Sequence, residues 1–199
     1  FTGLMELVIM MVNDEIIKKP ETKIDENKDT ICFLGQRLSY EAVQYFLLNK
    51  PAGCVTATRD KLSETVMSYL PENRRDDLFP VGRLDKDTEG LLIFTNDGAL
   101  AHSLISPKNG IEKEYYVEHT GSVKKEDIAA FKAGMVLDDE TLKPALLIPM
   151  DEGKSRVVVT EGKYHQVRRM MAIRGMDVTY LKRIREGKLT LGSLEVGKW

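Results

Sequence analysis

A charged loop that runs directly into an apolar segment limits the possible folds of this chain more than any other stretch does. Residues 82–90 read Gly-Arg-Leu-Asp-Lys-Asp-Thr-Glu-Gly, and residues 91–95 read Leu-Leu-Ile-Phe-Thr. The second run is short, rich in β-branched and aromatic side chains and closed by the turn residues 96–98, which predicts a buried strand. Such a strand would anchor the carboxylate of Asp85. An isolated Asp in a loop usually bonds its own backbone, so the pattern alone leaves Asp85 a structural or a functional role.

The composition is that of a soluble globular protein, with 42% hydrophobic and 30% charged residues among 199. This length allows one ordinary domain with a small appendage. The longest apolar run, residues 7–12, is far shorter than the roughly 20 residues that a membrane helix needs. Two cysteines and three scattered histidines are too few for a zinc site. We therefore expect no membrane contact, no metal, no cofactor and a reduced, cytoplasmic location.

The charge is unevenly distributed along the chain. The formal net charge is −2, from 29 basic and 31 acidic residues. Residues 163–188 nevertheless contain eight basic side chains against two acidic ones, a local charge of +6, which leaves −8 for the remainder. A run of this kind is either a solvated face or a surface that binds phosphates.

The first forty residues read as a separate small unit. Residues 6–12 and 15–18 predict two strands joined by a tight turn at Asn13-Asp14, and residues 31–34 predict a third strand. The polar residues 36–40 are interpreted as a linker. The predicted domains are therefore residues 1–40 and 41–199.

The second unit alternates strands and helices with short turns. Its expected strands are residues 42–48, 91–95, 112–118, 146–149 and 156–160. Its expected helices are residues 64–70 with Ser63 as N-cap, a segment that Asp97 caps, residues 122–133 and a segment after residue 166. Strands that follow each other through short turns favour antiparallel pairing. We predict an α+β fold with a mixed or mainly antiparallel sheet, flanking helices and a cleft that holds the Asp85 loop.

Three short sequence motifs occur one after another along the chain. They are Asn-Lys-Pro-Ala-Gly at residues 49–53, Gly-Arg-Leu-Asp at residues 82–85 and Glu-Gly-Lys-Tyr-His-Gln-Val-Arg-Arg-Met at residues 161–170. Together they resemble the RNA pseudouridine synthases, specifically the branch that modifies ribosomal RNA and carries a small RNA-binding module in front. The resemblance covers about residues 41–192. It also implies that residues 1–40 are the back half of that module, because the two leading basic helices have no counterpart.

The resemblance implies a role for individual side chains. Asp85 corresponds to the catalytic aspartate, either as a nucleophile or as a base for a ribose proton. Arg168 is expected to pair with Asp85, and Tyr115, from Lys-Glu-Tyr at residues 113–115, to stack on the target base. Arg83 is a candidate for filling the space that the uridine leaves in the RNA. Further RNA contacts are assigned to Lys50, Lys163, Arg169, Lys182, Arg183 and Arg185, whereas His165 is interpreted as a structural histidine.

Three alternatives stay open for function. The expected partner is ribosomal RNA or a pre-ribosomal particle, bound by a monomer, and residues 131–145 look closer to the small-subunit enzymes than to their large-subunit relatives. A large-subunit enzyme is the first alternative, and an assembly factor that only binds RNA is the second. The third is a hydrolase that pairs Asp85 with Asp87 or Glu89, although these carboxylates lie within five residues on one loop and would struggle to flank a scissile bond.

Overall fold

The computed structural model describes residues 10–19, 21–25, 28–38 and 43–199. By its internal contacts the chain divides into two compact units, residues 1–42 and 43–199. No helix in these described ranges is long and apolar enough to cross a membrane. Each unit has its own sheet.

The front unit contains a four-stranded antiparallel sheet in the order β2-β1-β3-β4. Its strands are β1 (Met10–Val12), β2 (Glu15–Ile16), β3 (Ile31–Phe33) and β4 (Gln36–Leu38). Asn13 and Asp14 both have positive φ, which gives the predicted hairpin turn. The predicted linker is wrong for residues 36–38, because Leu34 and Gly35 make a second turn with positive φ that returns the chain onto β3. Residues 6–9 and 39–40 of the expected elements lie outside the described residues.

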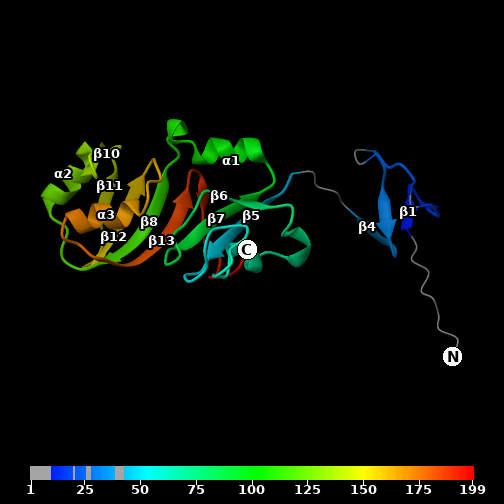
Figure 1. Ribbon diagram of the computed structural model, residues 1–199, viewed down its shortest axis with the longest axis horizontal. Coiled ribbons are helices and arrows are strands. Elements are labelled where there is room, and N and C mark those ends of the chain that lie inside the picture. The colour runs from blue at the N-terminus through cyan, green and yellow to red at the C-terminus, as the bar shows by residue number, and fades with distance from the viewer. Residues whose placement is uncertain (1–9, 20, 26–27, 39–42) are drawn as a thin grey trace, which may run out of the picture. The chain divides into compact units, whose positions relative to one another are not determined.

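The second unit is built on an eight-stranded sheet (Figure 1), which confirms the predicted α+β class. Its longest path runs β11-β12-β8-β13-β7-β5, while β14 pairs with β13 and β6 with β7. All these pairs are antiparallel except that between β13 and β7. The strands are β5 (Tyr45–Lys50), β6 (Phe79–Val81), β7 (Glu89–Thr95), β8 (Lys113–His119), β11 (Leu146–Pro149), β12 (Lys154–Val159), β13 (Val178–Glu186) and β14 (Leu189–Thr190).

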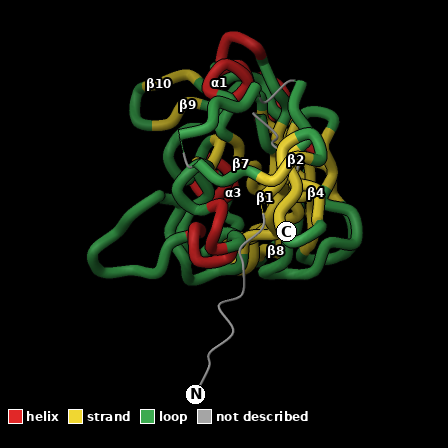
Figure 2. The backbone as a smooth tube through the Cα atoms, turned by 90° about the vertical axis from the view of Figure 1, so that its right-hand side faces the viewer, coloured by secondary structure: helices red, strands yellow, loops and turns green. Residues whose placement is uncertain are grey.

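Helices are few and short, as the red segments of Figure 2 show. They are α1 (Gly98–Ile105), α2 (Lys125–Ala133) and α3 (Gln166–Ile173), with 3₁₀ turns η1 (Val66–Tyr69), η2 (Glu72–Arg74) and η3 (Pro107–Asn109), and a separate hairpin of β9 (Val136–Leu137) and β10 (Glu140–Thr141). Asp97 caps α1 as predicted, since its side chain accepts a bond from the amide of Leu100.

The predicted helix over residues 64–70 is wrong, because only the short turn η1 forms there, with Thr65 instead of Ser63 as its cap. Two backbone hydrogen bonds explain this difference. Val55 donates to the carbonyl of Glu64, and Val66 donates to the carbonyl of Val55. These bonds hold the start of the segment extended, and Leu70 is extended again before Pro71.

Two apolar clusters meet at Tyr115 of β8. One cluster includes Val167, Met170 and Met171 of α3, packed against β8, β12 and β13. The other surrounds β5 and β7 and contains Leu84 from the loop that carries Asp85. Tyr115 packs against both clusters. The core therefore fixes the Asp85 loop and the start of α3 on either side of one tyrosine.

Candidate active site

The Asp85 loop is held from its neighbouring residues. Leu84 is buried, and the Thr56 hydroxyl both donates to its carbonyl at 2.8 Å and accepts from its amide at 3.1 Å. At the other end, Gly90 has φ +108°, and a Cβ there would lie 2.1 Å from the carbonyl oxygen of Arg183. Only glycine allows β7 to approach β13 this closely. The backbone position of Asp85 is thus fixed at both ends of its loop.

Lys50 makes several side-chain hydrogen bonds to this loop. This position corrects its assignment as an RNA contact. Its side chain is fully buried at the end of β5, and its Nζ donates to the carbonyls of Pro51 (3.0 Å), Asp85 (3.1 Å), Lys86 (3.4 Å) and Thr88 (2.9 Å). Burial lowers the pKa of Lys50, while the nearby Cys54 thiol and the loop carboxylates act in the opposite direction. A lysine whose donors point inward cannot reach a phosphate, so Lys50 is a brace for the loop.

Replacing Lys50 with methionine is expected to lower the free energy of unfolding by on the order of 3 kcal/mol, because buried carbonyls lose their donor. Urea denaturation of the purified variant measures this. Lys86→Met is the matched control, since Lys86 lies on the same loop, is exposed and donates only to Ser63 Oγ among the hydrogen bonds found in the described residues. An unchanged urea midpoint for Lys50→Met would contradict the bracing role.

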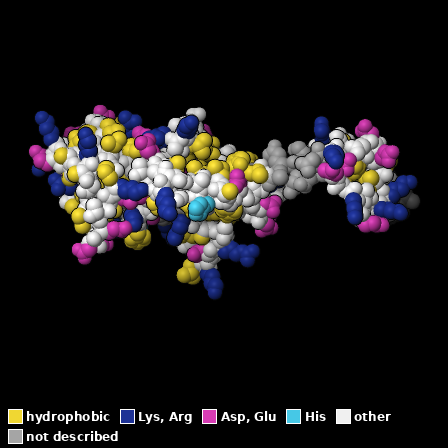
Figure 3. Space-filling model, turned by 90° about the horizontal axis from the view of Figure 1, so that it is seen from above, with side chains coloured by type: hydrophobic (Ala, Val, Ile, Leu, Met, Phe, Trp, Pro, Cys, Tyr) yellow, Lys and Arg dark blue, Asp and Glu magenta, His cyan; other side chains and the backbone are white. Residues whose placement is uncertain are grey.

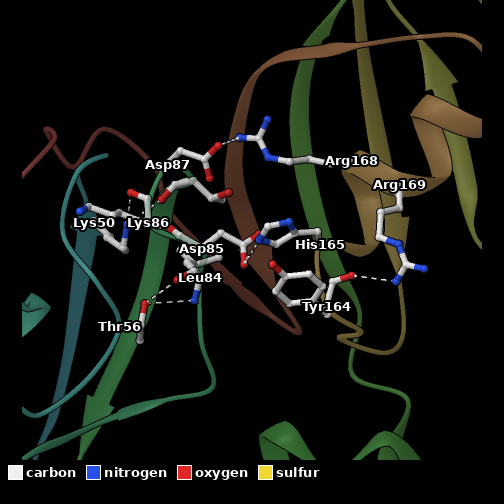
Figure 4. A network of polar contacts seen from close by, with 11 residues as sticks. Lys50, Thr56, Leu84, Asp85, Lys86, Asp87, Tyr164, His165, Arg168 and Arg169 are labelled. Atoms are coloured by element: carbon white, nitrogen blue, oxygen red, sulfur yellow. Dashed lines mark hydrogen bonds and ion pairs between the residues drawn. The ribbon is translucent and has the colours of Figure 1, made fainter. Parts of the chain in front are cut away.

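Asp85 presents its carboxylate to a cleft. Its side chain is 32% exposed, and Oδ1 lies 3.4 Å from Nε2 of His165, the residue that precedes α3. Figure 4 shows the two side chains pointing toward each other. The cleft is also lined by Tyr115, Arg83 and Lys163.

Arg168 does not contact Asp85, which corrects the predicted pairing. Its guanidinium lies 3.0 Å from Oδ2 of Asp87 and donates to the carbonyl of Val178 at 3.2 Å. Figure 4 shows it reaching the outer part of the loop, while His165 reaches Asp85. The interpretation of His165 as a purely structural histidine therefore missed the side chain nearest to the Asp85 carboxylate among the described ion pairs. Its only sequence signal was its place in the third motif.

Tyr115 lies in the same cleft as Asp85, as expected for a residue that contacts the base. Burial raises the pKa of its hydroxyl, and the neighbouring guanidinium of Arg183 opposes that shift. Tyr115 is therefore neutral at physiological pH and offers an aromatic face together with a hydroxyl proton. Its role toward a base stays a prediction.

Three of the other predicted RNA contacts on β13 do not face this cleft. Arg183 is buried; its Nε donates to the carbonyl of Leu91 at 2.8 Å, and its guanidinium lies 3.2 Å from Glu186. Lys182 and Arg185 line a different hollow, together with Tyr116, whose side chain points away from that of Tyr115. The alternation of β8 and β13 thus places Lys182 and Arg185 on the sheet face away from Tyr115, where their contact with RNA stays a prediction. Arg183 lies on the face of Tyr115, but it is buried and bonded inside the fold, so its assignment as an RNA contact is wrong.

The basic segment is largely neutralised inside the fold. Six of its eight basic residues have a carboxylate partner: Lys163 with Glu140, Arg168 with Asp87, Arg169 with Asp138, Arg174 with Asp127, Arg183 with Glu186, and Arg185 with Glu112 and Glu114. Figure 3 shows basic and acidic side chains interspersed on the face that it presents. The local charge of +6 therefore overstates the phosphate-binding surface. Arg83 and Lys163 are the predicted RNA contacts that line the Asp85 cleft.

No three or more His, Cys, Asp or Glu side chains converge in a way that could hold a metal ion within the part of the chain that the structure describes. The cleft is lined by the carboxylates of Asp85 and Glu161, one imidazole, one phenol and nearby cations. Glu161 is buried and accepts from the Lys143 amide and the Gln166 side chain, which leaves Asp85 as the exposed carboxylate of the cleft. A carboxylate in such a site can attack an electrophilic carbon or accept a proton.

Comparison with known proteins identifies close relatives of the chain. Residues 44–173 match the family model described as RNA pseudouridylate synthase. An uncharacterized RNA pseudouridine synthase, YtzG, of Bacillus subtilis is 38% identical over 92% of this chain and 79% of its own length. The ribosomal small subunit pseudouridine synthase A of Haemophilus influenzae is 38% identical over 94% of this chain and 82% of its own. The protein of the same name in Escherichia coli K12 is 37% identical over 90% and 79%.

The fold of this chain also matches that of solved structures. A crystal structure of a pseudouridylate synthase superimposes with a TM-score of 0.76 at 37% identity, covering 96% of this chain and 84% of that one. The archaeal box H/ACA sRNP Nop10-Cbf5 complex contains a chain that matches with a TM-score of 0.50 at 19% identity over 73% of this chain and 48% of that one, which indicates a shared fold alone.

Proposed function

This chain belongs to the RNA pseudouridylate synthase family, and from that premise we propose that it converts a uridine of small-subunit ribosomal RNA to pseudouridine with Asp85 as the catalytic carboxylate. The observation that carries the proposal is a cleft lined both by Asp85, on a loop held by Lys50, and by Tyr115 of β8. The curated relatives named for the small ribosomal subunit support the choice of RNA. No cofactor is required.

The chemistry needs only one carboxylate. The bond between the ribose carbon and the base nitrogen breaks, the base turns over, and a carbon–carbon bond to the same ribose carbon forms. Nothing is oxidised and no energy source is consumed. Asp85 can attack the ribose carbon, or it can stabilise the cationic sugar and remove a ribose proton; both routes use the same oxygen atoms. Tyr115, which lines the same cleft, would support the base while it turns.

Binding requires the target uridine to leave its stack, which costs a few kcal/mol. Arg83 is exposed and lines the Asp85 cleft, so it would fill the space that the uridine vacates. Lys163 lines the same cleft and would contact the backbone, although it also pairs with Glu140. Arg168 acts on the reaction indirectly, by holding the loop through Asp87.

Chemical mapping of pseudouridine in ribosomal RNA tests the function directly. A strain that lacks the protein should lose pseudouridine at one position of the small-subunit RNA, and the wild-type gene should restore it. The test must cover both subunits, because residues 131–145 and the relatives' names are what favour the small one.

The other outcomes of this mapping separate the alternatives. Loss at a large-subunit position alone would overturn the choice of RNA but keep the chemistry. An unchanged pseudouridine pattern would overturn the isomerase and favour an assembly factor that only binds RNA. The hydrolase pair is disfavoured because Asp87 is engaged with Arg168.

A further inference from the structure

We propose that Tyr164 and His165 form an aromatic platform on which the base of a nucleotide beside the target uridine stacks. This inference rests on the proposed function and names a further part of its RNA site. The two rings are stacked on each other, with centroids 3.9 Å apart and an angle of 16° between their planes. Tyr164 is 74% exposed and belongs to none of the hydrophobic clusters. Core packing therefore does not explain its position.

The platform begins at the catalytic carboxylate. His165 lies 3.4 Å from Asp85, and Tyr164 stacks on its ring, so the aromatic surface extends from the reacting group outward (Figure 4). Both rings line a cleft of about 500 Å³ that also contains Asp85. This cleft is larger than the one that holds Asp85 with Tyr115, and it has room for a nucleotide beyond the target.

Three cationic side chains line this cleft. Arg83 and Lys86 come from the Asp85 loop, and both are exposed. The third is Lys163, which also pairs with Glu140. Proteins that bind single-stranded nucleic acid combine aromatic rings that stack bases with cations that follow the backbone. A polyanion with planar bases fits this combination, whereas an acidic protein segment would leave the ring face unused. The occupant we infer is therefore RNA.

The backbone that carries the two rings is fixed before RNA binds. His165 has φ +46°, an uncommon conformation for a residue other than glycine, directly before α3. The backbone around it is fixed by three bonds: the Lys163 amide donates to Gln166 Oε1 at 3.0 Å, the Gln166 amide donates to the Lys163 carbonyl at 3.1 Å, and Arg169 donates to the Tyr164 carbonyl at 3.4 Å. A surface that is already ordered loses less entropy on binding. This order favours a binding surface over an incidental surface contact.

Binding of a fluorescent RNA to Tyr164 variants tests the platform. The probe is a small-subunit RNA fragment that contains the target uridine and carries 2-aminopurine in turn at each neighbouring position. All proteins carry Asp85→Asn, so that binding is measured without turnover. Tyr164→Ala should weaken binding by about 5- to 150-fold, the range that corresponds to the loss of one base stack. Tyr164→Phe keeps the ring and should bind within about twofold of the Tyr164 protein.

The fluorescence distinguishes stacking from other contacts. At one position, 2-aminopurine should be quenched by the Tyr164 protein and by the Tyr164→Phe variant, which both carry an aromatic ring, and not by the alanine variant. Tyr45→Ala serves as the matched control, since Tyr45 is also an exposed tyrosine but lies on β5 outside this cleft, and it should change neither reading. Equal affinity and quenching for Tyr164→Ala would overturn the platform, as would a loss shared by Tyr164→Phe, which would indicate a hydroxyl contact instead.

Failure of the platform and failure of the proposed function are separable. Pseudouridine formed by the Tyr164→Ala protein with native Asp85, at normal RNA affinity, would overturn the platform and leave the isomerase intact. Conversely, ring-dependent quenching by a wild-type protein that forms no pseudouridine would overturn the isomerase and keep the stacking surface.

Discussion

Replacing Asp85 with asparagine is expected to lower pseudouridine formation by at least about 10³-fold, while the fold and the RNA affinity stay close to wild type. Asparagine keeps the size of the side chain but removes the negative charge that either route to pseudouridine requires. The fold should tolerate this change, because the loop is held through backbone carbonyls by Lys50 and through Leu84 by Thr56. Turnover, RNA binding and thermal unfolding of the same preparation measure the three quantities.

Asp87→Asn is the matched control for this change. Asp87 lies two residues away, is 66% exposed and pairs with Arg168 instead of His165. Its loss should loosen the loop and leave most of the turnover. Equal inactivation of both variants would mean that pseudouridine formation needs both carboxylates, and that Asp85 is not the single catalytic carboxylate. Clear pseudouridine formation by a folded Asp85→Asn protein would overturn the catalytic assignment itself.

The elements that the sequence predicts well are those set by neighbouring residues. The buried run of β7, the Asp97 cap of α1 and the alternation of Tyr115 and Tyr116 all follow from local patterns, and the structure contains each of them. The helix expected over residues 64–70 fails for the opposite reason. Its backbone is held by Val55, a tertiary partner that no local pattern contains.

The third motif, residues 161–170, likewise does not reveal its tertiary contacts. His165 and Arg168 are three residues apart, and the motif leaves open which of them reaches Asp85. The answer depends on how α3 is rotated on the sheet, and that rotation is set by the packing of Val167, Met170 and Met171 into the core. As packed, His165 reaches Asp85 and Arg168 reaches Asp87. A sequence motif thus identifies the site, but it does not show which side chains in the site form ion pairs with each other.

The sequence is least informative about which charged side chains are exposed and which are buried. Lys50 and Arg183 both look like surface cations, yet each is fully or almost fully buried and bonded to backbone carbonyls of β7 or its preceding loop. Long basic side chains can serve as internal braces when several acceptors converge on them, because the converging bonds compensate for lost hydration. Such acceptors come from distant segments. Only the fold reveals whether a lysine or an arginine points outward.

Arg183→Met gives the clearest test of this interpretation, and we expect it to lower the free energy of unfolding by about 3–5 kcal/mol. Arg183 and Glu186 have side-chain exposures of 2% and 1%, and their charged groups lie 3.2 Å apart. Removing the guanidinium leaves Glu186 buried with only Lys113, at 3.9 Å, as a cationic partner among the described residues. A buried carboxylate that loses its main partner is strongly destabilising. Chemical denaturation measures the loss.

Replacing both partners should restore much of that stability, because Arg183→Met with Glu186→Leu removes the buried charge as well as its partner. Lys182→Met is the control on the same strand: its side chain lies on the other sheet face beside Tyr116, so its effect on stability should be small. If Arg183 instead contacted RNA, Arg183→Met would unfold like the wild type and bind RNA with a reduced dependence on salt. That result would mean that the Arg183 side chain adds nothing to the stability of the free protein, and it would overturn the internal brace described here.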